Sequence, residues 1–188
     1  YYFLSYSKSL MPHYCDTAPG HETHSVYHDT EYGFPVLDDN LLFERLVLEI
    51  NQAGLSWATV LKKRQAFWSA FQGYDPRLVS SFGAEDKGRL LRNREIIRNK
   101  LKIDSVIYNA SIICDFISKF GSFTGWLEHH HPLELEDWVA LFKKNFKFTG
   151  KEITGEFLMS IGYLKGAHRE TCPIFSEISR LKPPWMRA

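Results

Sequence analysis

Four residues of the kind that bind zinc stand at opposite ends of this chain. Cys15 and His28 lie near its start, and His168 and Cys172 lie near its finish. Thiolate and imidazole are the usual ligands of a closed zinc site, and the spacing of the second pair suits one face of a helical turn. A single Zn²⁺ bound by all four would hold the two ends of the chain together. The alternative is chance placement among 3 cysteines and 8 histidines, since Cys-x12-His is not by itself a zinc-finger signature.

The composition is that of a soluble globular protein with a large aromatic share. Of 188 residues, 44% are apolar, 15% are aromatic and 24% are charged, and the formal net charge is +1. This length suffices for one good hydrophobic core, and the composition argues against disorder. We expect a single domain over residues 15–175, an N-terminal extension over 1–14 and a C-terminal tail over 176–188. We also expect a monomer.

The cellular setting is predicted from what the sequence lacks. No apolar run is long enough to span a bilayer, so no membrane partner is expected. The first residues, YYFLSYSKSLMPHY, do not have the pattern of a secretory signal. We therefore expect a cytoplasmic protein with reduced thiols, in which Cys114 is a small buried residue of an apolar run.

Apolar residues recur at helical spacing along most of the chain, and no stretch alternates convincingly as a strand would, so we predict an all-α fold. Asp38 or Asp39 caps a helix that ends by Gly54, and Ser56 caps the next. Residues 121–132 show no clear pattern, and the three histidines at 129–131 are expected in an exposed loop. A short helix is predicted to start at Asp75-Pro76, and further helices are predicted near residues 84–93, 94–120 (one helix or two), 135–144 and 151–161. The last two, joined by NFKFTG, predict a helix-hairpin-helix.

Glu49 lies at the edge of the apolar stripe of the first long helix. Its neighbours on that face are Leu42, Leu46 and Ala53, at spacings of three and four residues. Burying a carboxylate costs several kcal/mol unless it is paired. Glu49 therefore has a protein partner, an altered pKa or a ligand to bind, and a salt bridge to an arginine or lysine is the simpler alternative.

The segment AGLSW that follows joins two predicted helices. Gly54 lets the backbone turn sharply and approach another molecule closely. Leu55 is left as an apolar residue at the junction, and Trp57 begins the next helix. A carboxylate, a bare backbone, an apolar side chain and an aromatic ring thus fall within nine residues.

The chain resembles the 3-methyladenine DNA glycosylase I family of the helix-hairpin-helix glycosylase superfamily. The resemblance is carried by C-x12-H, YHDTEYGFP, LLFERLVLEINQAGLSWATVLKKR, NFKFTG and HRETC, and it covers Cys15 to Cys172. It implies excision of 3-methyladenine from alkylated double-stranded DNA by hydrolysis of the N-glycosidic bond. It also implies that Cys15, His28, His168 and Cys172 hold a structural Zn²⁺.

The implied chemistry suits the residues that the resemblance selects. Methylation at N3 gives the base a positive charge, and an aromatic box of Tyr27, Tyr32 and Trp57 would attract it by stacking and cation–π contact. Glu49 would accept a hydrogen bond from the exocyclic amine and favour the cation by its charge. Core packing is the alternative role of the aromatic residues.

The duplex is expected to be held through its phosphates and opened at the damaged base. Leu55, beside Gly54, is the predicted wedge that fills the gap left by the flipped base. The hairpin is the preferred phosphate contact, through Lys147, Lys151 and the backbone at Gly150. Other basic clusters occur at 62–64 and at positions 94, 98 and 102, where solvated surface is the alternative.

The sequence departs from the family at the aromatic box. Thr17 and His24 stand where the family has a Trp and a Tyr, and Tyr32 replaces a Trp. His24 can still stack on a base, whereas Thr17 cannot. No Asp follows the hairpin between Gly150 and Cys172, which agrees with this family and argues against a glycosylase for neutral bases.

Other classes of function stay open at this point. A homologue that binds damaged DNA without cleaving it is the first of them. The others are a hydrolase that uses Zn²⁺ as a Lewis acid and an enzyme with a cysteine nucleophile. No lysine is poised for strand cleavage, so we predict a monofunctional glycosylase.

Overall fold

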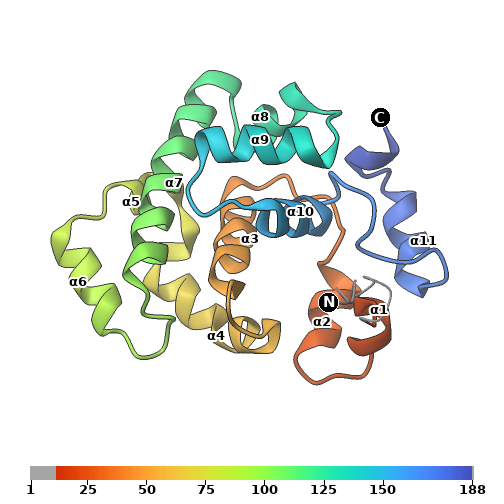
Figure 1. Cartoon of the computed structure of the whole chain (residues 1–188), viewed down its shortest axis with the longest axis horizontal. Coiled ribbons are helices and arrows are strands. Elements are labelled where there is room, and N and C mark those ends of the chain that lie inside the picture. Colours follow the sequence, from red (N-terminus) through yellow and green to blue (C-terminus); the bar gives the residue numbers. More distant parts are fainter. Residues whose placement is uncertain (1–11, 188) are drawn as a thin grey trace, which may run out of the picture.

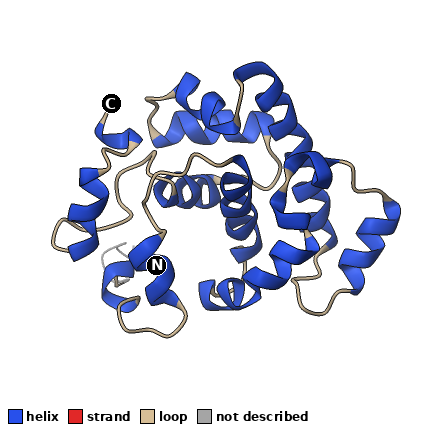
Figure 2. Ribbon diagram, turned by 180° about the vertical axis from the view of Figure 1, so that it is seen from behind, coloured by secondary structure: helices blue, strands red, loops and turns tan. Residues whose placement is uncertain are grey.

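The computed structural model describes residues 12–187, and within them every regular element is helical (Figure 2). The predicted all-α fold is therefore confirmed. None of the helices in this range is both long and apolar enough to cross a membrane. The elements are α1 (Tyr14–Thr17), α2 (His24–Thr30), α3 (Asp39–Gln52), α4 (Trp57–Ala70), η2 (Gln72–Tyr74), α5 (Pro76–Ser80), α6 (Ala84–Arg92), α7 (Lys100–Phe120), α8 (Phe123–His130), α9 (Leu135–Asn145), α10 (Lys151–Ser160), α11 (Pro173–Arg180) and η3 (Pro184–Met186).

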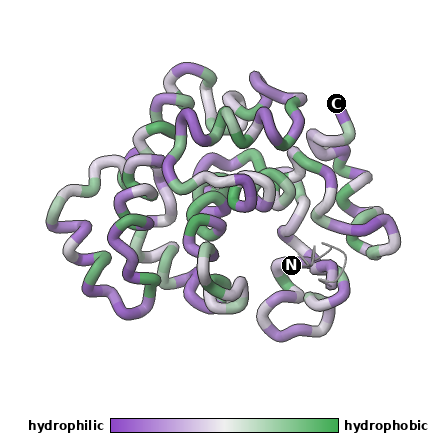
Figure 3. Tube along the Cα trace, viewed as in Figure 1, coloured by the Kyte–Doolittle hydropathy of each residue, from purple (hydrophilic) through white to green (hydrophobic). Residues whose placement is uncertain are grey.

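Helix α3 lies in the middle of the molecule and carries much of its hydrophobic sequence (Figures 1 and 3). It begins because the Asp38 carboxylate accepts a hydrogen bond from the Leu41 amide at 2.9 Å. Its apolar side chains Leu42, Leu46 and Ile50 are fully buried in the main core. Because α4, α7 and α10 all pack against α3, this helix is held rigidly, and so are the side chains on its surface.

The predicted helices are present, with two differences: one helix starts later than expected, and a helix occurs where a loop was expected. The segment 94–99 is not helical, because Asn99 caps α7 by accepting from the Lys102 amide at 3.2 Å. The expected loop at 121–132 contains α8, whose Trp126 stacks on Phe116 with ring centroids 4.3 Å apart. The loop predicted for the three histidines is therefore wrong, since His129 and His130 end α8.

Helices α1, α2 and α11 lie side by side at one edge of the molecule (Figure 1). The predicted N-terminal extension lies mostly outside the described residues, and its last residue, Tyr14, begins α1. The predicted boundary of the C-terminal tail falls inside α11, where Ile178 is buried. Residues 176–187 therefore pack on the rest of the chain.

Aromatic residues from the N-terminal part of the chain form, with Ala167, a hydrophobic cluster separate from the main core. Tyr27, Tyr32 and Ala167 are its buried members, and Tyr14, Trp57, Leu61 and Met159 pack against them. Gly33 lies where the N-terminal and C-terminal segments pack closely together, since an added Cβ would lie 2.8 Å from that of Ala167. Its backbone is also left-handed, with a φ of 85°, which favours glycine.

Helices α9 and α10 are joined by the short segment 146–150. Asn109 of α7, which is fully buried, holds this segment through the backbone amide and carbonyl of Lys147. Its amide donates to the Lys147 carbonyl at 3.0 Å, and its oxygen accepts from the Lys147 amide at 2.8 Å. The turn between α9 and α10 is thus fixed to α7.

Candidate functional site

The four Cys and His residues from the two ends of the chain meet in one cluster. Their ligand atoms all lie within 4.8 Å of one another, and three of the four residues are buried. Cys172 Sγ lies 3.4 Å from His168 Nδ1 and 3.9 Å from His28 Nε2, and Cys15 Sγ lies 3.6 Å from His168 Nδ1. The cluster could bind a metal ion, as the sequence predicted.

The surroundings of both histidines suit metal ligands. His28 Nδ1 lies 2.6 Å from Asp29 Oδ1, and His168 Nε2 lies 2.8 Å from the carbonyl oxygen of Tyr32. When these nitrogens donate to their acceptors, the other nitrogen of each ring keeps its lone pair toward the cysteines. Metal-binding histidines in proteins usually have such a partner on the second nitrogen.

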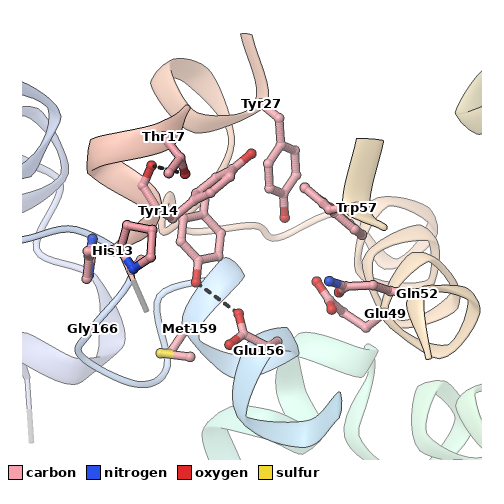
Figure 4. Close-up of a pocket in the computed structure, with 13 residues that line it drawn as sticks. His13, Tyr14, Thr17, Tyr27, Glu49, Gln52, Trp57, Glu156, Met159 and Gly166 are labelled. Carbon is pink, nitrogen blue, oxygen red and sulfur yellow. Dashed lines mark hydrogen bonds between the residues drawn. The ribbon is translucent and has the colours of Figure 1, made fainter. Parts of the chain in front are cut away.

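A pocket of about 530 Å³ opens beside this cluster, between α1, α2, α3, α4 and α10 (Figure 4). Of the residues predicted to bind a base, Tyr27, Tyr32, Glu49 and Trp57 line it, and so does Thr17. His24 is not among the lining residues, and its Nδ1 lies 3.0 Å from the Tyr14 hydroxyl. The other pocket residues, which the sequence did not predict, are Pro12, His13, Tyr14, Gln52, Glu156, Met159, Gly166 and Ala167.

The aromatic rings meet edge to face along the wall of the pocket. Tyr27 and Trp57 have centroids 5.1 Å apart at 66°, and Tyr14 and Tyr32 have centroids 5.4 Å apart at 85°. The Tyr27 hydroxyl is buried, and no hydrogen-bond partner for it exists among residues 12–187. The wall therefore combines ring faces and edges with an unused polar group, which suits a flat polar ligand.

Glu49 is buried in this pocket, with 5% of its surface exposed. Burial raises the pKa of its carboxyl to about 8, and the negative charge of Glu156 acts in the same direction, whereas Arg45 lowers it. No hydrogen bond from the described part of the chain contributes to this pKa. Arg45 instead makes a short ion pair with Glu31 and lies over the Tyr27 ring, 4.8 Å from its centroid.

A second pocket of about 550 Å³ adjoins the first and shares Glu49, Gln52 and Glu156 with it. Its wall includes Leu55 from the α3–α4 junction together with Gly150 and Lys151 at the start of α10. Leu55 is 41% exposed, and Gly54 turns the backbone there with a φ of 82°. Leu55 and the start of α10 thus lie on the approach to Glu49.

The family of the chain follows from comparison with known proteins. The methyladenine glycosylase family profile matches residues 17–137. The chain is 35% identical over 156 residues to DNA-3-methyladenine glycosylase 1 of Escherichia coli, covering 73% of this chain and 83% of that protein. It is 32% identical over 166 residues to DNA-3-methyladenine glycosylase of Haemophilus influenzae, covering 78% and 89% respectively.

The chain belongs to the methyladenine glycosylase family. A solved structure shares its fold, namely a variant of 3-methyladenine DNA glycosylase I in complex with 3-methyladenine. The two align with a TM-score of 0.75 and 27% sequence identity over 85% of this chain and 96% of that one.

The predicted basic clusters of this methyladenine glycosylase are largely engaged within the protein. Arg64 binds the Glu44 carboxylate at 2.8 Å and 2.9 Å, so it is not a free surface charge. Near the connection between α9 and α10, Lys147 lies 4.0 Å from the centroid of the Tyr108 ring, and Lys151 pairs with Glu136 at 2.9 Å. Both lysines are exposed, and contacts of this kind at the surface are weak.

Lys102 is not part of a surface cluster, because its side chain is buried beneath the α3–α4 junction. Its ammonium donates to the carbonyl oxygens of Asn51 at 2.9 Å and Ala53 at 2.7 Å. These carbonyls end α3 immediately before Gly54. In this methyladenine glycosylase Lys102 therefore holds the end of α3, two residues before Leu55.

We expect Lys102→Met to lower the free energy of unfolding by about 1–3 kcal/mol, because two carbonyls at the end of α3 lose their donor. Urea unfolding measures this change. Lys100→Met is the matched control, since Lys100 is exposed and pairs only with Asp104. Equal stability of the two variants would contradict this role of Lys102.

Proposed function

We propose that this chain removes 3-methyladenine from alkylated DNA by hydrolysing the N-glycosidic bond, which leaves an abasic site for base excision repair. Membership of the family supports the activity. The observation that carries the assignment to a site is Glu49, a buried carboxylate that faces an aromatic-walled pocket and lacks a hydrogen bond within the described chain. Such a group is costly to the fold unless a ligand satisfies it.

The pocket suits a methylated adenine because its aromatic wall and its carboxylate both favour a flat cation. Tyr27, Tyr32 and Trp57 would contact the base by stacking and cation–π attraction. Glu49 would accept a hydrogen bond from the exocyclic amine, strengthened by its charge. A base that already carries a positive charge is a good leaving group, so positioning supplies much of the catalysis.

The adjoining pocket provides a path for the DNA strand. A duplex base has to leave the stack before it can enter the site, at a cost of a few kcal/mol. We propose that Leu55 fills the resulting gap, while Gly54 allows close approach of the backbone. Lys147, Lys151 and the backbone amides after Gly150, at the N-terminus of α10, would contact the phosphates.

We propose that the Cys15, His28, His168 and Cys172 cluster holds Zn²⁺ as a structural cross-link. The donor set is typical of structural zinc, and both histidines have acceptors for their second nitrogen. Four protein ligands leave no open position for water, so the ion would have no catalytic role. Tyr32 connects the two sites, because its carbonyl contacts His168 while its hydroxyl donates to Glu156 at 3.0 Å.

Base release from methylated duplex DNA tests the proposed function. Chromatography separates released 3-methyladenine from 7-methylguanine, and a denaturing gel reports whether the strand stays intact. We expect selective release of 3-methyladenine without strand breakage. Failure of folded, zinc-loaded protein to release any base would instead support a homologue that only binds damaged DNA.

We expect Leu55→Ala to slow base release from duplex DNA by about tenfold, because a smaller side chain fills less of the gap left by the flipped base. Its exposure means that stability should change by less than about 0.5 kcal/mol. Binding of free 3-methyladenine should be unchanged. Leu37→Ala is the control, since Leu37 is 76% exposed and lies outside both pockets. An equal effect of the two substitutions would exclude a wedge.

A further inference from the structure

A second carboxylate faces Glu49 across the base pocket. Glu156 comes from α10 and Glu49 from α3, and both line the two adjoining pockets. Figure 4 shows both side chains at the pocket, with the Glu156 carboxylate at the end of a dashed hydrogen bond to a tyrosine hydroxyl and the Glu49 carboxylate below Tyr27 and Trp57. Packing of α10 on α3 thus places two like charges in one partly enclosed space.

Little in the pocket neutralises this pair. Glu156 accepts a hydrogen bond from the Tyr32 hydroxyl at 3.0 Å, which is a neutral donor. Arg45, the cation nearest Glu49 along α3, already pairs with Glu31. Of the residues that line the pocket, only His13 is of a basic type. Two carboxylates that share a site do not ionise independently, so one of them tends to keep a proton.

We propose that Glu156 is a specificity-determining residue of the base pocket, which together with Glu49 forms a two-carboxylate site selective for positively charged purines. The inference rests on the proposed function for the identity of the cationic base. A neutral purine offers no charge to offset the repulsion between the carboxylates. A cationic base does so, and it displaces the proton that the pair holds when the pocket is empty.

The groups around the pair support this exchange of a proton for a cation. Burial raises the pKa of Glu156, helped by the charge of Glu152, whereas the Tyr32 hydrogen bond and His13 lower it. Burial and the charge of Glu156 raise the pKa of Glu49 to about 8, against Arg45. The remaining titratable groups at the site are Tyr14, Tyr27 and Tyr32, whose pKa values burial raises, so they stay neutral near pH 7.

The predicted signature is a dependence of cation binding on pH. Below pH 8 the pair holds a proton that binding must release, so affinity for a cationic base should rise by up to about tenfold per pH unit and then level off. Affinity for a neutral purine should not rise in this way. In Glu156→Gln, Glu49 loses its like-charged neighbour, so the rise should occur at lower pH and release fewer protons near pH 7.

Calorimetric titration of the zinc-loaded full chain tests the inference without requiring catalysis. The probe is 3,9-dimethyladeninium, a permanent cation in which a methyl group replaces the sugar, and 9-methyladenine is the neutral comparison. Titrations in buffers of different ionisation enthalpy count the protons released. At pH 8 we expect Glu156→Gln to lower the ratio of cation to neutral affinity by roughly tenfold, and Glu156→Asp to restore the pH dependence.

Glu85→Gln is the control, because Glu85 is exposed on α6 and lines neither pocket. An unchanged pH profile and an unchanged affinity ratio in folded Glu156→Gln would overturn the inference. That result is distinct from failure of the proposed function, which is measured by wild-type base release. If the wild type binds the cation with this pH profile but releases no base, the inference about Glu156 would stand and the proposed glycosylase activity would be refuted.

Discussion

Glu49→Gln is expected to slow release of 3-methyladenine by roughly 10- to 100-fold near pH 8, the effect of losing one charged hydrogen bond. Glutamine keeps the shape of the side chain and removes its charge. With its pKa raised to about 8, the Glu49 carboxylate becomes increasingly ionised between pH 6 and 8. The wild-type rate should therefore rise over this range while the variant stays flat, so the difference should widen with pH.

Although Glu49→Gln should lower the activity, it should not lower the stability of the fold. A carboxyl whose pKa is higher in the folded than in the unfolded state destabilises the fold progressively as pH rises from its ordinary value through about 8. Glu49→Gln removes that cost, so the variant should be at least as stable as wild type at pH 8. Thermal unfolding at pH 5 and pH 8 measures this. A variant that is both less active and less stable would indicate a structural role for Glu49.

Loss of a metal ligand is the second change with a large expected effect. We expect Cys172→Ser to bind little zinc and to lose base release, because a structural zinc ion contributes on the order of 10 kcal/mol to the elements it holds. Elemental analysis measures the metal, and hydrogen exchange locates the loosening. Protection should fall in α1 and α2, which carry Cys15 and His28 as well as the pocket residues Tyr14 and Tyr27.

The main core should survive this substitution. The buried members of that core lie between Leu42 and Tyr163, and none comes from α1 or α2. Far-ultraviolet circular dichroism should therefore keep most of its helical signal. Cys114→Ser is the matched control, since Cys114 lies on α7 beside Ser80 and outside the cluster. Full zinc content in Cys172→Ser, or unchanged protection of α2, would contradict the proposed site.

The sequence predicts those parts of the fold that local signals determine. Asp38, Ser56 and Asp75 each accept a backbone amide at the start of a helix, and such caps can be identified from a few neighbouring residues. Helix α8 has a weaker pattern, with Gly125 inside it and Pro132 after it. Its stability comes from burial of Phe123 and Trp126 against other helices, which no local pattern reveals.

Side-chain environments were predicted less well than helices. Ala53 was expected on an apolar face and is exposed, because helical spacing does not show how far a neighbouring helix extends. Lys102 was expected at the surface and is buried under the end of α3.

The candidate site was predicted in part because motifs mark some of its residues. Glu49 stands out as a charge on an apolar face, and the family resemblance selects the aromatic residues. Glu156 has no such mark, since it is one of several charged residues on α10. Only the packing of α10 on α3 brings it to Glu49.

The wide separation of the cluster residues has a consequence for protein synthesis. Cys15 and His168 are 153 positions apart, so the ribosome makes the first cysteine long before its partners. Until residues 168–172 emerge, α1 and α2 have no partner at the cluster and the aromatic wall is incomplete. Because the main core itself includes residues as late as Tyr163, the core and the base pocket are both completed only when this part of the chain has been translated.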